Sequence, residues 1–213
     1  MPRLLTADQQ RSRMKISEQC LERFNKNKTD FVHRFITMNE TWIHHYTPES
    51  KKQSKQWTEA GCSAPKKTML VPSVGKIMAS VFWDPERILS IDYLEKGKTI
   101  TGEYCSHLLN RLDEKIREKS SGLQKKSIFH QDNATAHKSV LAMGKLRDLH
   151  YELLEHPPCS PDLAPSVFFL FPKLKFFHAG QGFSSNQEAI AAVDGSYEEP
   201  LQGRDNGAGA SLE

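Results

Sequence analysis

The stretch Ile128-Phe129-His130-Gln131-Asp132-Asn133-Ala134 decides how the rest of this chain is interpreted. Its apolar start, from Ser127 onward, is typical of a short buried strand, and a helical pattern opens after Ala134. A carboxylate at the C-terminal end of a buried strand is well placed to hold a metal or a substrate, because the strand end is rigid and the loop beyond it is open. Asp132 could equally cap the following helix, a role that aspartate favours. The spacing alone leaves both roles open.

The composition indicates one soluble globular domain, or one domain with tails. The 213 residues include 38% hydrophobic and 26% charged residues, and the formal net charge of +3 is too small to identify a nucleic-acid partner. The four cysteines are scattered without a Cys-x-x-Cys pair, so we expect reduced structural thiols and no zinc site. No apolar run reaches the roughly 18 residues of a membrane span, and no signal region opens the chain, so we expect no membrane partner.

The order of the predicted elements indicates an α/β fold with a mixed sheet. A helix over 6–28 precedes a strand region over 31–46, which the polar pair Asn39-Glu40 interrupts. That interruption fits a bulge, two short strands, or a site residue on a central strand. Three antiparallel strands followed by alternating helices and strands imply a mixed sheet with helices on both faces. The later predicted elements are strands over 76–83, 87–94, 127–130 and 151–155, and helices from 101, over about 136–149, after Pro165 and after Ser185.

The segment 47–76 lacks periodicity and carries an excess of basic residues. A connection this long inside a compact domain is usually functional or disordered. The basic excess predicts contact with DNA phosphates, although a merely solvated loop fits the composition equally well. The candidate DNA-binding residues are Lys51, Lys52, Lys55, Lys66, Lys67 and Lys76.

Several long stretches, in this order, resemble the catalytic domain of Tc1/mariner-family (mariner) transposases. They are Val32–Thr37, Glu40–Tyr46, Gly75–Asp84, Gly97–Tyr104, His130–Ala134, Ser160–Ser166 and Phe169–Pro172. The resemblance implies an RNase H-like domain over 31–193, a linker helix over 1–30 before it, and a divergent, disordered tail over 194–213. It also implies a nuclear location, and that 47–76 is a clamp-like loop that touches DNA and the partner in a homodimer.

Members of this family hold two divalent ions, Mg²⁺ or Mn²⁺, with three carboxylates. The resemblance assigns these positions to residues that are Asn39, Asp132 and Val167 in this sequence. Asn39 offers only a neutral oxygen and Val167 offers no ligand, so the remaining negative charge does not offset the repulsion between two dications. Glu40 should face the opposite side of its strand, and Asp162 belongs to a proline-fixed loop, so we expect neither to substitute. Asp132 and Asn39 are therefore what remains of a degenerate metal site.

Our lead hypothesis is a mariner catalytic domain that is inactive in DNA strand cleavage and that keeps nonspecific DNA binding. A weakly active, metal-dependent nuclease or transposase is a second hypothesis, and the count of acids opposes it. A relic without function is a third. A fourth is a domesticated DNA-binding or dimerisation module, such as a mariner domain fused to a SET methyltransferase. No SET-like region is present in this sequence, and we expect no small-molecule substrate.

Overall fold

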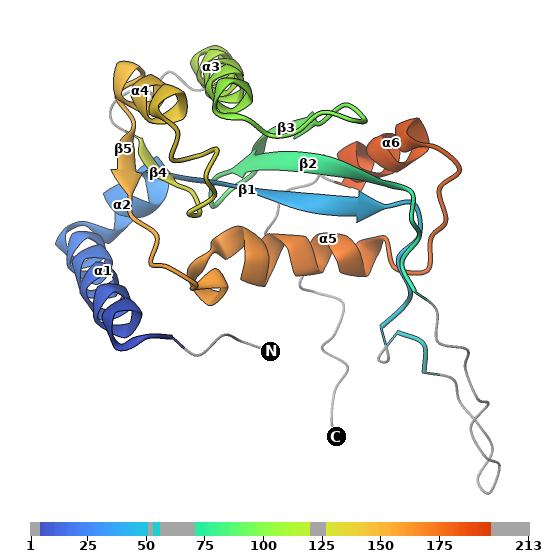
Figure 1. Cartoon of the computed structure of the whole chain (residues 1–213), viewed down its shortest axis with the longest axis horizontal. Coiled ribbons are helices and arrows are strands. Elements are labelled where there is room, and N and C mark those ends of the chain that lie inside the picture. Colours follow the sequence, from blue (N-terminus) through green and yellow to red (C-terminus); the bar gives the residue numbers. More distant parts are fainter. Residues whose placement is uncertain (1–4, 51–52, 56–70, 120–126, 197–213) are drawn as a thin grey trace, which may run out of the picture.

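A five-stranded mixed sheet forms the centre of the protein, with the strand order β3-β2-β1-β4-β5 (Figure 1). The computed structural model describes residues 5–50, 53–55, 71–119 and 127–196. The first three strands pair antiparallel, whereas β4 runs parallel to β1 and β5 runs parallel to β4. This order confirms the prediction of three antiparallel strands followed by two more. The strands are β1 (Phe35–His44), β2 (Lys76–Trp83), β3 (Ile88–Tyr93), β4 (Ile128–His130) and β5 (Glu152–Leu154).

Helices cover both faces of the sheet, as the sequence predicted (Figure 1). On one face, α3 (Gly102–Lys119) and α4 (Val140–Asp148) pack over a core that includes Ile36 and Met38 of β1. On the other face, the second core joins Ile43 of β1 to three helical segments. These segments are a π-helical turn η2 (Ser166–Leu170), α5 (Phe171–Phe177) and α6 (Asn186–Ser196). The two cores show which face of the sheet each residue of β1 joins.

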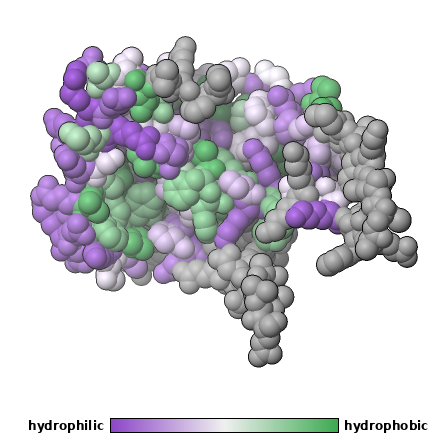
Figure 2. Space-filling view, turned by 90° about the horizontal axis from the view of Figure 1, so that it is seen from below, coloured by the Kyte–Doolittle hydropathy of each residue, from purple (hydrophilic) through white to green (hydrophobic). Residues whose placement is uncertain are grey.

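The surface of η2 and α5 that points away from the sheet is apolar. Seen from below in Figure 2, apolar side chains gather on this side of the molecule. The exposed large apolar residues of the two segments are Val167, Phe168, Phe176 and Phe177. None of the helices in the described ranges combines the length and the apolarity that crossing a membrane requires.

The N-terminal helical region differs from the prediction at its end. Helix α1 (Ala7–Lys26) begins at a capping box formed by Thr6 and Gln9, and Asn27 starts a second helix, α2 (Lys28–Arg34), by accepting a hydrogen bond from the backbone of Asp30. The predicted strand start at Phe31 is therefore wrong, and the strand begins at Phe35. Phe31 packs its ring against Phe24 and Phe35, so its aromatic character serves helix packing.

Strand β1 is continuous through the polar pair that was expected to interrupt it. Its pairing with β2 runs without a shift from Thr37 opposite Trp83 to His44 opposite Lys76. A bulge or a break at Asn39-Glu40 is therefore wrong, and both residues lie on the central strand of the sheet. At the other end of the chain, α6 continues to Ser196, so residues 194–196 are helical. The rest of the predicted disordered tail, 197–213, lies outside the described residues.

Candidate functional site

Asn39 and Glu40 point to opposite faces of the central strand. Side chains alternate along a strand, so Asn39 shares the face of Ile43 and Glu40 shares the face of Met38. Asn39 therefore faces η2, α5 and α6, whereas Glu40 faces α3 and α4. The predicted opposition of these two side chains is confirmed by the two cores that their neighbours join.

Asp132 lies level with Asn39 at the C-terminal end of β4. His130 on β4 is paired in parallel register with Thr37 on β1, and Asp132 and Asn39 follow two residues later on each chain. One carboxylate oxygen of Asp132, Oδ1, accepts a hydrogen bond from the backbone N–H of Ala134 at 2.9 Å. Asp132 thus caps the turn after β4, whereas Ser139 caps α4 by accepting from the backbone N–H of Ala142. The hypothesis that Asp132 caps the following helix is therefore wrong, because Ser139 is the cap of α4.

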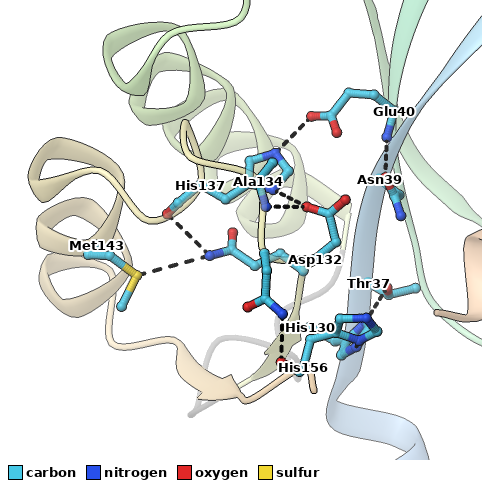
Figure 3. A network of polar contacts seen from close by, with 11 residues as sticks. Thr37, Asn39, Glu40, His130, Asp132, Ala134, His137, Met143 and His156 are labelled. Carbon is cyan, nitrogen blue, oxygen red and sulfur yellow. Dashed lines mark hydrogen bonds and ion pairs between the residues drawn. The ribbon is translucent and has the colours of Figure 1, made fainter. Parts of the chain in front are cut away.

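His137 joins Asp132 to Glu40, and this contact was not predicted from the sequence. Its Nδ1 lies 2.8 Å from Oδ1 of Asp132, and its Nε2 lies 2.9 Å from Oε1 of Glu40. Figure 3 shows Glu40 extending from β1 to the ring of His137, with Asp132 at the other ring nitrogen. The His137 side chain is only 1% exposed, so both contacts are shielded from solvent. The available signal was a histidine five residues after Asp132 in Asp-Asn-Ala-Thr-Ala-His.

The bridge is ionic, because carboxylates accept hydrogen bonds and both nitrogens of His137 must donate. Burial lowers the pKa of His137, but the hydrogen bonds to Asp132, to the Cys105 side chain and to Glu40 outweigh that effect and raise the pKa to about 12. The hydrogen bond from His137 in turn holds the pKa of Asp132 below its usual value. A protonated imidazole with a carboxylate at each nitrogen follows from this geometry.

A second buried histidine, His130, lies in a neutral setting on the opposite face of the sheet from the bridge. Its Nδ1 lies 3.0 Å from Oγ1 of Thr37, and its Nε2 lies 3.2 Å from Nδ1 of His156. Burial, together with the neighbouring His156, lowers the pKa of His130 to about 4. His130 is therefore uncharged at neutral pH.

Val167 lies on η2, which contacts β1 on the face of Asn39. The neighbouring Ser166 fixes this turn, because its hydroxyl accepts a hydrogen bond of 2.9 Å from the indole N–H of Trp83. The side chain of Val167 has no atom that can bind a metal. The predicted frame of positions 39, 132 and 167 is thus built from adjacent elements, with an acid at only one of them.

The residues of this frame do not fit a pair of divalent ions. Oδ1 of Asn39 accepts a hydrogen bond of 2.8 Å from the backbone N–H of Glu40, so the oxygen of the side chain is already engaged. Glu40 binds His137, and Asp162 forms an ion pair with Arg13, so both substitute acids have other partners. Within the described ranges, no three histidine, cysteine, aspartate or glutamate side chains gather as a metal ion would require.

The structure covers two of the six basic residues predicted to bind DNA. Lys55 is exposed, and Lys76 begins β2 with its ammonium group 4.1 Å from the centre of the Trp42 ring. The C-terminal end of the basic segment is attached to the end of β1, because the backbone N–H of His45 donates to the carbonyl of Gly75 at 2.8 Å. The other predicted DNA-binding residues, Lys51, Lys52, Lys66 and Lys67, lie outside the described residues.

Residues 47–126 match the family model described as "Transposase (partial DDE domain)". The human protein "Histone-lysine N-methyltransferase SETMAR" is 32% identical over 194 residues, which are 89% of this chain and 27% of that protein. The mariner Mos1 transposase of Drosophila mauritiana is 31% identical over 198 residues, which are 91% of this chain and 56% of that protein. The chain thus spans about a quarter and about half of the lengths of these two relatives.

Solved structures of the Mos1 transposase share this fold. The crystal structure of its catalytic domain aligns with a TM-score of 0.74 at 26% identity, covering 92% of this chain and 84% of that one. The Mos1 paired-end complex with Mg aligns with a TM-score of 0.81 at 29% identity, covering 93% of this chain and 57% of that one. These matches confirm the predicted RNase H-like fold, and together with the sequence relatives they show that this chain is homologous to the mariner Mos1 transposase and matches the structure of its catalytic domain.

Proposed function

We propose that this chain is a mariner catalytic domain that does not cleave DNA and that binds DNA without sequence specificity. The loss of cleavage rests on one observation, the neutral side chains at two of the three acid positions. Asn39 and Val167 supply no negative charge, and Asp132 alone does not offset the repulsion between two dications. Losing even a supporting partner of a metal ligand costs about 10–100-fold in affinity or activity, and losing two ligands should cost more.

Binding of DNA is supported by the relatives and by the basic residues. The solved Mos1 complexes are described as paired-end complexes, one of them with the left transposon end, so that protein binds DNA. In this chain Lys55 and Lys76 both belong to the basic segment 47–76. Lysine contacts to phosphates release counterions whatever the base sequence, which is why we propose nonspecific binding. A nuclear location and contacts within a homodimer complete the proposal, by analogy with these relatives.

Nicking of supercoiled plasmid in Mg²⁺ and in Mn²⁺ tests the proposed loss of cleavage. The parent chain is compared with the double variant Asn39→Asp, Val167→Asp, and with that double variant carrying Asp132→Ala. We expect no nicking by the parent, nicking by the double variant, and none once Asp132 is removed. A parent chain that nicks DNA and loses this activity on Asp132→Ala would refute the proposal.

A weak metal-dependent nuclease is the second candidate, because Glu40 lies only one histidine away from Asp132. In that case the parent would nick plasmid, and Glu40→Gln would abolish the activity. Binding is measured separately, by fluorescence anisotropy with duplexes of unrelated sequence. We expect equal affinities for all duplexes. We also expect Lys55→Ala and Lys76→Ala each to reduce, by about one, the slope of the logarithm of affinity against the logarithm of salt concentration.

A further inference from the structure

We infer that Asp132 serves this chain as a structural tie, fastening the turn after β4 through His137 to Glu40 on β1. The hydrogen bonds of this tie set the orientation of the Asp132 carboxylate. The inference goes beyond the proposed loss of cleavage, because it gives the one remaining acid of the frame a role that needs neither metal nor DNA.

The geometry of the bridge carries this inference. His137 is 1% exposed, and both of its ring nitrogens are used, at 2.8 Å by Asp132 and at 2.9 Å by Glu40. The Glu40 side chain is 13% exposed, so the ring is enclosed on the side of β1 as well. A buried cation held by two carboxylates loses much of its stabilisation if either carboxylate is removed, because the other charges remain buried.

The bridge connects elements that are far apart in the chain. Glu40 lies on the central strand, whereas His137 follows 97 residues later, in the turn between β4 and α4. Gln131 extends the same attachment by donating from Nε2 to the carbonyl of His137 at 3.3 Å. The turn after β4 is thus held to the sheet by side chains of Gln131, Asp132 and His137, which favours a structural role for all three.

The Asp132 carboxylate is oriented by these contacts. Oδ1 receives both the backbone N–H of Ala134 and Nδ1 of His137, which fixes the plane of the group. Figure 3 shows the carboxylate held between the turn and β1. The other two positions of the frame are Asn39 and Val167, and the orientation comes from His137.

A double-mutant cycle in the parent chain tests the tie. Asp132→Asn, His137→Gln and the double variant are unfolded in urea without metal. We expect each single variant to shift the folding equilibrium about 10–100-fold toward the unfolded state, the lower end reflecting the partial exposure of Asp132. The double variant should cost little more than either single variant, because both remove the same bridge. Ser139→Ala is the matched control: it weakens the cap of α4 in the same turn, and its effect should add to that of Asp132→Asn.

Three results would overturn the inference. One is additive effects of Asp132→Asn and His137→Gln. Another is an increase in stability on Asp132→Asn, as expected where an acid is kept for function at a cost in stability. The third is a rise in the unfolding midpoint of the parent with Mn²⁺ that Asp132→Asn removes, which applies even if His137→Gln or the double variant fails to fold. None of these readouts depends on DNA cleavage, so failure of the tie and failure of the proposed function are distinguishable.

Discussion

The two faces of β1 differ in charge although their residues alternate along one strand. On the α3 and α4 face, Glu40 joins an ionic bridge with a buried histidine that is protonated. On the η2 and α5 face, Thr37 contacts a buried histidine that is neutral, and Oδ1 of Asn39 accepts a hydrogen bond from the backbone N–H of Glu40. Pairing and packing of the strand do not distinguish the faces, since both are closed by apolar cores. The same sheet therefore accommodates a charged bridge on one face of β1 and neutral polar contacts on the other.

The largest effect that separates the two faces is expected with pH. The pKa of His130 is lowered to about 4 in the folded chain, whereas the unfolded value is near 6.5, so the unfolded state binds a proton in this interval and the folded state does not. Stability should therefore fall by about 3 kcal/mol as the pH drops from 6.5 to 4. The raised pKa of His137 affects stability in the opposite direction. Its stabilising contribution is complete below pH 6.5 and is lost progressively as the pH rises from 6.5 toward about 12.

Urea unfolding at a series of pH values measures this difference. His130→Gln should reduce the slope between pH 6.5 and 4, to which His156 and His178 also contribute because burial lowers the pKa of each. The exposed His33→Gln serves as the control that should leave the slope unchanged. An unchanged slope in His130→Gln would show that another group titrates in this interval. The raised pKa of His137 predicts that stability falls between pH 7 and 9 and that His137→Gln abolishes this loss, so no loss in the parent, or an equal loss in the variant, would contradict it.

The sequence predicted the sheet better than the polar contacts within it. Strands over 76–83 and 87–94 were predicted almost to the residue, because β-branched and aromatic residues flank a proline turn. Two aromatic residues, Phe31 and Phe35, gave a strand signal that the helix cap at Asn27 overrode up to Arg34. A helix cap is difficult to predict from the sequence when the residues that follow it favour strands.

The frame of the candidate site stays a prediction from the sequence, and its polar contacts were not predicted. Positions 39, 132 and 167 came from motifs that keep their order along the chain. The contact of Glu40 with His137 joins residues 97 positions apart, so no local pattern records it. The helix predicted over about 136–149 was also placed too early: α4 begins at Val140, because Ser139 caps it, and Val140 and Leu141 are exposed. Long-range polar contacts depend on packing, which the sequence does not display directly.

An exchange of amide and acid at neighbouring positions gives the next largest effect. Glu40→Gln keeps the shape of the side chain and removes the charge facing His137, so we expect a loss of about 1–2 kcal/mol, the difference between a charged and a neutral hydrogen bond. Asn39→Asp makes the reverse exchange one residue away, and should cost about 1 kcal/mol because it adds a poorly solvated carboxylate near Asp132. Mn²⁺ should restore the stability of Asn39→Asp and leave Glu40→Gln unchanged. Urea unfolding with and without Mn²⁺ measures both effects, and equal responses of the two variants to the ion would remove the distinction between the faces.

The smallest effect on stability is expected at Val167, the position that the resemblance assigns to the third acid. The Val167 side chain is 39% exposed on η2, so Val167→Asp exchanges a surface methyl pair for a solvated carboxylate. We expect the free energy of unfolding to change by less than about 0.5 kcal/mol, the usual range for surface positions. Leu170→Asp is the control on the same turn: Leu170 is 1% exposed, and a carboxylate there should unfold the chain or cost several kcal/mol. A large loss of stability in Val167→Asp would mean that valine is needed for packing at this position. A small one would mean that the acid can return without cost to the fold, which separates the absence of a ligand from any defect of the scaffold.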